Sequence, residues 1–302
     1  MGLNLSGMTT ETRNPRTMRL DQMSPLEIVT VMNEEDARVP LAIAKCLPQI
    51  AQAVTWAAEA FEKGGRLFYM GAGTSGRLGV LDAAECPPTF GVPKEMVVGL
   101  IAGGEKAFIE AVEGAEDSRE LAVEDLKAHG LTANDFVVGI AASGRTPYVL
   151  GGLDYAKSVG CHTAAIACNI GSAIGKAAEL AIEVNCGPEV LTGSTRLKSG
   201  TAQKLILNMI STGSMVRTGK AYQNLMVDVQ QTNEKLHTRA ENIVIDATGV
   251  EREKARAAID AAGGSVKTAI TMLLADCDAA EAARRLEKAR GHVREAIRLE
   301  VL

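Results

Sequence analysis

Five short apolar runs, separated by segments of helix length, occupy the middle of the chain. They lie at residues 66–70, 96–101, 135–141, 162–167 and 180–184, and each has the length of a buried strand. Strands that alternate with helical segments are typical of a parallel sheet with helices on both faces. The pattern therefore predicts an α/β fold built on a parallel five-stranded sheet flanked by helices.

Two helical segments are predicted ahead of the first strand. Ser24 can cap a helix that begins at Pro25, and the apolar spacing carries this helix to about Val39. A longer, apolar-rich helix or helix pair then ends at Gly64-Gly65, which is a suitable C-terminal cap. The first twenty residues are polar and weakly periodic, so we expect them to form an extended arm.

The C-terminal part of the chain has a different composition. From about Asn242 onward it is Ala-rich and helical, with breaks at residues 248–249, 263–264 and 276–278, which predicts a small helical bundle. We therefore divide the chain into three parts: an N-terminal arm with helices at residues 1–60, a sheet domain at residues 61–222, and a C-terminal helical region at residues 223–302.

Composition and charge exclude several classes of protein. The net charge of −5 and the aromatic content of 3% do not suit a nucleic-acid-binding surface, which needs basic patches and stacking rings. No apolar run reaches the roughly 18 residues that span a bilayer, and the N-terminus lacks the apolar core of a signal peptide. We therefore expect a cytoplasmic protein without a membrane partner. The cysteines form neither a CxxC motif nor a cluster with histidine, which argues against a metal site.

A glycine-rich turn follows the first predicted strand. Gly71, Gly73 and Gly76 allow a tight turn and the close approach of a ligand. Thr74 and Ser75 add hydroxyl and backbone N–H donors at the start of a helix, an arrangement that suits an anion such as phosphate. The GxGxxG spacing also occurs in dinucleotide sites, which need an acidic residue about twenty positions later. A purely structural turn is the third interpretation.

A second turn of the same kind follows the third predicted strand. Ser143 and Thr146 flank Gly144 at the start of a helix, where their hydroxyls could bind an anion or only cap the helix. Because the carboxyl ends of parallel strands meet at one edge of a sheet, we expect both turns to face one ligand. A third candidate segment, residues 193–201, precedes a long helix.

Two carboxylates follow the first and second strands. Glu85 falls inside the helix after the glycine-rich turn, too early for the acidic residue of a dinucleotide site. Glu116 lies in a Gly-containing break that follows a predicted helix over residues 105–112. It could reach a bound sugar, or it could be a solvated carboxylate favoured by the helix macrodipole.

Five motifs together resemble one family of enzymes. They are GAGTSGR, AECPP, EGAEDS, AASGRTPY and GSTRLKSGTAQK, and the TETRNP arm and the NEKLHTR segment agree with them. The combination covers nearly the whole chain and looks like N-acetylmuramic acid 6-phosphate etherase of the sugar isomerase (SIS) superfamily. The resemblance implies that residues 61–222 form a SIS sugar-phosphate-binding domain.

The resemblance implies a lyase that needs neither a cofactor nor a metal. Such an enzyme removes D-lactate from C3 of N-acetylmuramic acid 6-phosphate and adds water, giving N-acetylglucosamine 6-phosphate during peptidoglycan recycling. The family's catalytic carboxylates carry over to Glu85 and Glu116. We assign Glu116 as the base that removes the C2 proton, and Glu85 as the acid that protonates departing lactate and then activates water.

The substrate ligands carry over from the resemblance as well. The phosphate would be held by Thr74, Ser75, Ser143, Gly144 and Thr146. Arg77 or Arg145 could bind the lactyl carboxylate through two parallel hydrogen bonds, or could instead support a catalytic carboxylate. Ser194 and Lys198 could complete the sugar pocket, although a lysine in the first turn of a helix is often solvated.

The resemblance further implies a homodimer, because SIS domains commonly pair and share sites. His237 could then support opening of the sugar ring in the partner's site, although a packed or exposed histidine is the alternative. Two other functions stay open: a binding protein, like the glucokinase regulatory protein whose SIS domains resemble this family, and an aldose–ketose isomerase, which shares the C2 proton abstraction.

Overall fold

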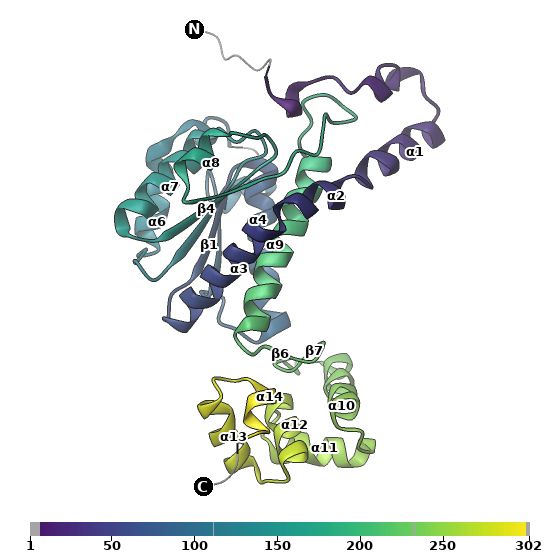
Figure 1. The fold of residues 1–302 in the computed structure, drawn as a ribbon, viewed down its shortest axis with the longest axis vertical. Helices are drawn as coiled ribbons and strands as arrows, with labels where there is room; N and C mark the ends of the chain where they lie inside the picture. The colour runs from purple at the N-terminus through teal and green to yellow at the C-terminus, as the bar shows by residue number, and fades with distance from the viewer. Residues whose placement is uncertain (1–6, 111, 232, 300–302) are drawn as a thin grey trace. The chain divides into compact units, whose positions relative to one another are not determined.

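The computed structural model describes residues 7–110, 112–231 and 233–299. At its centre is a parallel sheet of five strands in the order β2-β1-β3-β4-β5 (Figure 1). The strands are β1 (Leu67–Gly71), β2 (Val97–Ile101), β3 (Phe136–Ile140), β4 (His162–Ala167) and β5 (Leu180–Glu183). All five predicted strands are confirmed, and their ends differ from the predicted ones by no more than one residue.

Helices cover both faces of the sheet (Figure 1). One face carries α6 (Arg119–Ala128), α7 (Pro147–Val159) and α8 (Ala173–Ala177), and the other carries α3 (Leu47–Glu62), α4 (Gly73–Phe90) and α9 (Lys198–Arg217). Phe68 and Met70 join the core with residues of α6 and α7, whereas the hydroxyl of Tyr69 donates to the Leu207 carbonyl oxygen of α9 at 3.4 Å. Because both faces are covered, the strands read as continuous apolar runs.

The two candidate turns leave the sheet from neighbouring strands. β1 and β3 pair in parallel, with Gly71 opposite Ile140, although β2 lies between them in the sequence. The strand order therefore reverses direction between β1 and β3, and ligands of open parallel sheets bind at such a point. The prediction that both turns lie on one edge of the sheet is confirmed.

The first helices follow their local sequence signals. α1 (Pro25–Asp36) begins with a capping box, in which Glu27 N donates to Ser24 Oγ at 3.4 Å and Ser24 N donates to the Glu27 carboxylate at 2.7 Å. It ends before Val39, where a separate short helix, α2 (Val39–Ile43), begins. A 3-10 turn, η4 (Ala44–Cys46), then leads into α3.

The described part of the arm, from residue 7, is not one extended stretch as expected. It contains three 3-10 turns: η1 (Thr9–Glu11), η2 (Pro15–Thr17) and η3 (Leu20–Gln22). Local polar contacts form these turns, as when Asn14 Oδ1 accepts from Arg16 N at 3.0 Å. Residues 1–6, which belong to the predicted arm, lie outside the described residues.

The segment after β2 is less helical than predicted. The expected helix over residues 105–112 is limited to α5 (Lys106–Ile109), and residue 111 lies outside the described part. Gly103 and Gly104 have φ of +91° and +71°, and Glu110 is extended, so the chain turns away on both sides of α5. A 3-10 turn, η5 (Ala115–Asp117), then precedes α6.

The chain folds into two compact units. The first comprises residues 1–84 and 95–211, and so includes the arm, α1 to α3 and the sheet. The second comprises residues 85–94 and 212–302. α4 and α9 each contribute residues to both units. The three-part division drawn from composition stays a prediction.

The second unit contains a short hairpin and a helical bundle. The hairpin pairs β6 (Ala221–Tyr222) with β7 (Leu225–Met226). The helices are α10 (Glu234–Thr248), α11 (Arg252–Ala261), α12 (Val266–Ala275), α13 (Ala279–Lys288) and α14 (Val293–Ala296). Gly249 and Asp276 end α10 and α12 in the left-handed conformation, which confirms two predicted breaks; the third, at 263–264, lies between α11 and α12. Among the helices of the described chain, none is long and apolar enough to cross a membrane.

Candidate active site

The turn after β1 requires glycine for steric reasons. Gly73 has a φ of +51°. A Cβ atom on Gly71 would lie 2.8 Å from Gly76 N, and one on Gly76 would lie 2.6 Å from Gly71 O. The backbone therefore passes from β1 directly into the N-terminus of α4, whose free N–H groups favour an anion.

Thr74 and Ser75 stand in the first turn of α4 and have different surroundings. Thr74 is half-buried, and its hydroxyl makes no hydrogen bond to any residue that the structure describes. Ser75 is buried, and its Oγ lies 3.0 Å from Oε1 of Gln203 on α9, to which it donates. One hydroxyl is therefore free for a ligand, and the other is held by a neighbouring helix.

The turn after β3 also depends on its glycine. Gly144 has a φ of +74°, and a Cβ atom there would lie 2.4 Å from Ser172 Cβ. α7 begins at Pro147 with Thr146 at the N-cap position, but the Thr146 side chain makes no capping hydrogen bond. The hydroxyls of Ser143 and Thr146 have no hydrogen-bond partner in the described part of the chain, so both are available to a ligand.

The side chain of Asn169 links the N-terminal arm to this second turn. Asn169, which follows β4, donates from Nδ2 to the carbonyl oxygens of Ala142 and Ser143 at 3.3 Å. The same Nδ2 lies 3.0 Å from Thr10 Oγ1, and Asn169 Oδ1 accepts from Thr10 N at 3.3 Å. The arm therefore lies against the turn that carries Ser143.

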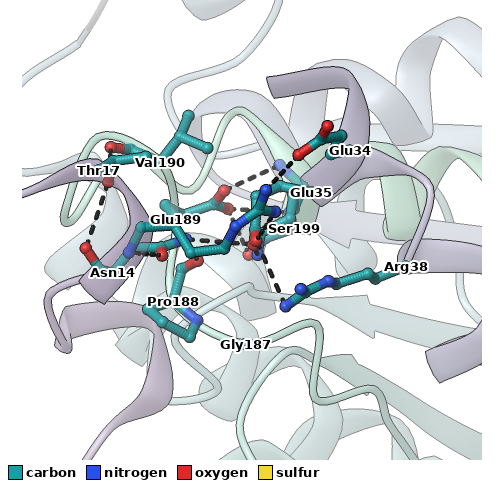
Figure 2. A network of polar contacts seen from close by, with 12 residues as sticks. Asn14, Thr17, Glu34, Glu35, Arg38, Gly187, Pro188, Glu189, Val190 and Ser199 are labelled. Carbon is teal, nitrogen blue, oxygen red and sulfur yellow. Dashed lines mark hydrogen bonds and ion pairs between the residues drawn. The ribbon is translucent and has the colours of Figure 1, made fainter. Parts of the chain in front are cut away.

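Lys198 lies in a buried charge cluster that joins the arm and α1 to α9. Its Nζ donates to Glu35 Oε2 at 2.6 Å, and each of the two residues is only 1% exposed. Asn14 and Arg16 donate to the same carboxylate at 3.1 and 3.0 Å (Figure 2). Burial opposes the ionisation of Glu35, but the hydrogen bonds from Lys198 and Arg16 outweigh it and lower the pKa of Glu35. The ammonium of this candidate sugar ligand is thus engaged in an ion pair.

A second buried carboxylate, Glu189, caps the N-terminus of α9 (Figure 2). It accepts from Lys198 N at 3.0 Å, from Ser199 N at 3.0 Å and from Ser199 Oγ at 2.9 Å. These are the N–H groups that a helix leaves unpaired at its start, so the protein's own anion occupies them. Ser194, in the loop before α9, is half-buried, and its hydroxyl is unbonded within the described residues.

Both candidate catalytic carboxylates are exposed. Glu85 lies on α4 in the second unit, and Glu116 lies in η5 of the first unit. Neither carboxylate has an ion pair or hydrogen bond among residues 7–110, 112–231 and 233–299. Unlike Glu35 and Glu189, each is therefore available for proton transfer.

The two candidate arginines have different partners. Arg77 donates from Nε and NH2 to the carbonyl oxygens of Phe108 and Ala107, at 2.8 Å each, and so supports the end of α5. Arg145 is half-buried, and within the described chain its guanidinium contacts Met8 Sδ at 3.6 Å. Because a thioether is a weak acceptor, Arg145 keeps most of its donors for a ligand.

His237 lies in the first turn of α10, in the second unit, and is exposed. Its Nδ1 lies 2.9 Å from Gln231 Oε1, an amide oxygen that can only accept, so Nδ1 donates. In the neutral ring this leaves Nε2 as a proton acceptor.

The sequence reasoning missed Glu35, Asn169 and Gln203. Glu35 and Gln203 are polar residues at buried positions of helices α1 and α9. Glu35 lies one helical turn after buried Val31, and Gln203 lies two turns before buried Ile210. A polar residue at an apolar-stripe position is normally paired, which is the signal that could have found both. Asn169 gives no such signal, because its partner Thr10 is 159 positions away.

The assembled donors suit an anionic substrate. They are hydroxyls, helix N–H groups and a guanidinium, all of which can donate hydrogen bonds to an anion. In the described part of the chain, no group of three or more His, Cys, Asp or Glu residues could hold a metal ion.

Comparison with known families identifies the fold. A model of the glucokinase regulatory protein N-terminal SIS domain matches residues 49–157, and a SIS domain model matches residues 120–212. A solved structure from Bacteroides fragilis, described as a candidate phosphosugar isomerase involved in capsule formation, is similar with a TM-score of 0.52. The match covers 67% of this chain and 95% of that one, at 21% identity. The predicted SIS fold is confirmed.

Much more similar relatives extend over nearly the whole chain. An N-acetylmuramic acid 6-phosphate etherase from an Exiguobacterium strain is 62% identical over 97% of this chain and 100% of the relative. Etherases from Serratia proteamaculans and a Geobacillus strain are 61% and 60% identical, over 98% and 97% of this chain and 99% of each relative. At this identity and coverage, the chain belongs to the N-acetylmuramic acid 6-phosphate etherase family.

Proposed function

We propose that this protein cleaves the D-lactyl ether of N-acetylmuramic acid 6-phosphate, with water addition, to give N-acetylglucosamine 6-phosphate and D-lactate. The observation that carries the proposal is the pair of glycine turns at the carboxyl ends of adjacent strands β1 and β3, in a member of the etherase family. Each turn opens a helix whose N-terminus favours a phosphate dianion. The reaction would serve peptidoglycan recycling, and we propose that it takes place in the cytoplasm.

The proposed reaction proceeds by elimination and then hydration. In the open-chain sugar, the C1 aldehyde makes the C2 proton acidic, and Glu116 removes it. The C3–O bond then breaks, and lactate leaves with a proton from Glu85, which produces an α,β-unsaturated aldehyde. Glu85 next takes a proton from water, whose oxygen adds to C3 while a proton returns to C2. The availability of both carboxylates for proton transfer supports these roles.

We propose that the phosphate binds to the two turns and that Arg145 binds the lactyl carboxylate. The free hydroxyls of Thr74, Ser143 and Thr146 support the phosphate assignment, together with the sharp turn at Gly144. Arg145 is preferred to Arg77 because two donors of Arg77 are already held by carbonyl oxygens. Ser194 could contact the sugar. We propose that Lys198 instead stabilises the fold through its ion pair with Glu35.

Release of D-lactate tests the proposed function directly. Incubation of the protein with N-acetylmuramic acid 6-phosphate should produce D-lactate and N-acetylglucosamine 6-phosphate in equal amounts, as measured by an enzymatic D-lactate assay and mass spectrometry. An aldose–ketose isomerase or a protein that only binds sugar phosphates would release no lactate. If the sugar phosphate binds and no lactate forms, the proposal is wrong.

We also propose that the protein is a homodimer and that His237 supports ring opening in the partner's site. Leu26 and Val29 on α1 are 74% and 57% exposed, and Leu41 on α2 is 71% exposed, which leaves an apolar surface uncovered in one chain. A second copy is the occupant that the SIS family membership favours. The Nε2 of His237 has no hydrogen-bond partner among the residues that the structure describes, which supports its assignment as an acid–base group.

Light scattering during gel filtration should give twice the mass of one chain. Leu26→Asp, combined with Val29→Asp, should shift the protein towards the monomer, because it places charge in the apolar surface. Leu274→Asp, at an exposed apolar residue of α12, is the matched control and should leave the mass unchanged. A monomeric wild-type protein at micromolar concentration would contradict the dimer.

A further inference from the structure

Helices α4 and α9 are joined by polar side-chain contacts at two places along their length. Near the start of α4, Ser75 Oγ lies 3.0 Å from Gln203 Oε1. Further along, Asp82 Oδ1 accepts from Asn208 Nδ2 at 2.7 Å and from Ser211 Oγ at 3.1 Å. Gln203 is fully buried, so its amide is not exposed to solvent.

The hydrogen bonds of Gln203 are incomplete. Its Oε1 accepts from Ser75, but its buried Nε2 has no partner among the described residues. In proteins, a buried N–H group without a hydrogen-bond partner is rarer than a buried carbonyl oxygen with too few partners, because the free-energy cost is lower for the oxygen. This orientation also uses the only hydroxyl hydrogen of Ser75, which then cannot donate to a phosphate.

Rotation of the amide by half a turn reduces the first problem and removes the second, because the unpaired position then belongs to the carbonyl oxygen and no longer to the N–H donors. Oxygen and nitrogen of a glutamine side chain have nearly the same size and shape, so the exchange needs no change in packing. Nε2 would then donate to Ser75 Oγ, and the Ser75 hydrogen would be free to point away from Gln203. The hydroxyl would thus become a donor at the N-terminus of α4, where the phosphate is expected.

We propose that Gln203 is a positioning residue that directs the Ser75 hydroxyl to the substrate phosphate by donating from Nε2 to Ser75 Oγ. The inference rests on the proposed function, in which Ser75 is a phosphate ligand. Gln203 itself touches no substrate. The alternative is that Gln203 only joins α4 to α9, as Asn208 does through Asp82.

The two roles predict different kinetics for Gln203→Met, which removes the amide at similar volume. If Gln203 positions Ser75, KM and the inhibition constant of the product sugar phosphate should both rise about tenfold. The reason is that the hydrogen bond from the Ser75 hydroxyl to the charged phosphate weakens. kcat should change much less. Ser75→Ala should give the same rise, and the double variant should be no worse than Ser75→Ala. Asn208→Leu is the control, with a lower Tm and an unchanged KM.

Gln203→Glu adds a readout that a structural role would not move. An ionised carboxylate only accepts, so it would hold the Ser75 hydrogen and raise KM, whereas the protonated carboxyl could donate to Ser75 again. Relative to wild type, KM of this variant should therefore fall as the pH is lowered. Wild-type KM in both Gln203 variants, with or without a lower Tm, would overturn the inference. Wild-type KM in Ser75→Ala would instead overturn the phosphate role of Ser75 in the proposed function, and the inference with it.

Discussion

Glu116→Gln should strongly reduce both D-lactate release and exchange of the C2 proton with solvent. An amide cannot act as the base for the C2 proton, and the loss of a general base lowers kcat by about 100- to 10,000-fold. Exchange is followed by incubating the enzyme with substrate in deuterium oxide and measuring deuterium at C2. The exposed, unpaired position of Glu116 means that the substitution breaks no contact within the described structure, so Tm should be unchanged.

Glu85→Gln is the matched variant, and it should separate removal of the C2 proton from the departure of lactate. Without the acid, lactate cannot leave with a proton, so D-lactate release should fall by a similar factor of about 100 to 10,000. C2 exchange should continue, because Glu116 still removes and returns the proton. If C2 proton exchange survived only in the Glu116→Gln variant, Glu85 would be the base and Glu116 the acid.

Lys198→Met should destabilise the fold more than it affects substrate binding. The substitution removes the buried cation of Glu35 and leaves its carboxylate only the more exposed Arg16 and Arg38, and breaking a buried ion pair in this way costs about 3 to 5 kcal/mol. The free energy of unfolding, measured by urea titration, should fall by that amount. Glu34→Gln is the control, because Glu34 is exposed and pairs with Arg16 at the surface, where a pair contributes about 0 to 1 kcal/mol.

A double variant and the pH dependence test the same cluster. Glu35→Leu with Lys198→Met replaces both charges by apolar groups and should be more stable than Lys198→Met alone. The pKa of Glu35 is lowered on folding, so its contribution is complete above the usual value of 4.5 and is lost as the pH falls through the folded-state value. Wild type should lose this stability below about pH 4.5, whereas Glu35→Gln should not show that loss. A raised KM without lower stability in Lys198→Met would instead place Lys198 at the sugar.

The sheet could be predicted from sequence because each strand carries its own signal. A strand such as β3, buried on both faces, appears as a continuous apolar run bounded by turn residues, whatever its neighbours are. The length of the helix after β2 was overestimated, because there the local apolar pattern does not decide where the helix begins and ends. The apolar residues beyond Ile109 continue a helical spacing, but the left-handed glycines before α5 and the extended Glu110 leave room for a single turn.

The two turns of the candidate site could also be predicted, because glycines and hydroxyls lie next to one another in the sequence. The residues that hold those turns could not. Asn169 and Gln203 act on Ser143 and Ser75 across large sequence distances, and the choice of partner depends on which helices and strands become neighbours. Lys198 shows the same limit, since its position in the first turn of α9 suggests a solvated side chain and reveals nothing of Glu35.

The attachment of the arm has a consequence for the order in which the chain folds. Thr10, Asn14 and Thr17 bond to Asn169, Pro188 and Val190, across 159, 174 and 173 positions of sequence. During synthesis the arm leaves the ribosome well before its partners, which follow it by more than 150 positions. Such distant pairings carry a high entropic cost of loop closure and form slowly. The arm, although it is made before its partners, is therefore expected to be among the last segments to reach its native place.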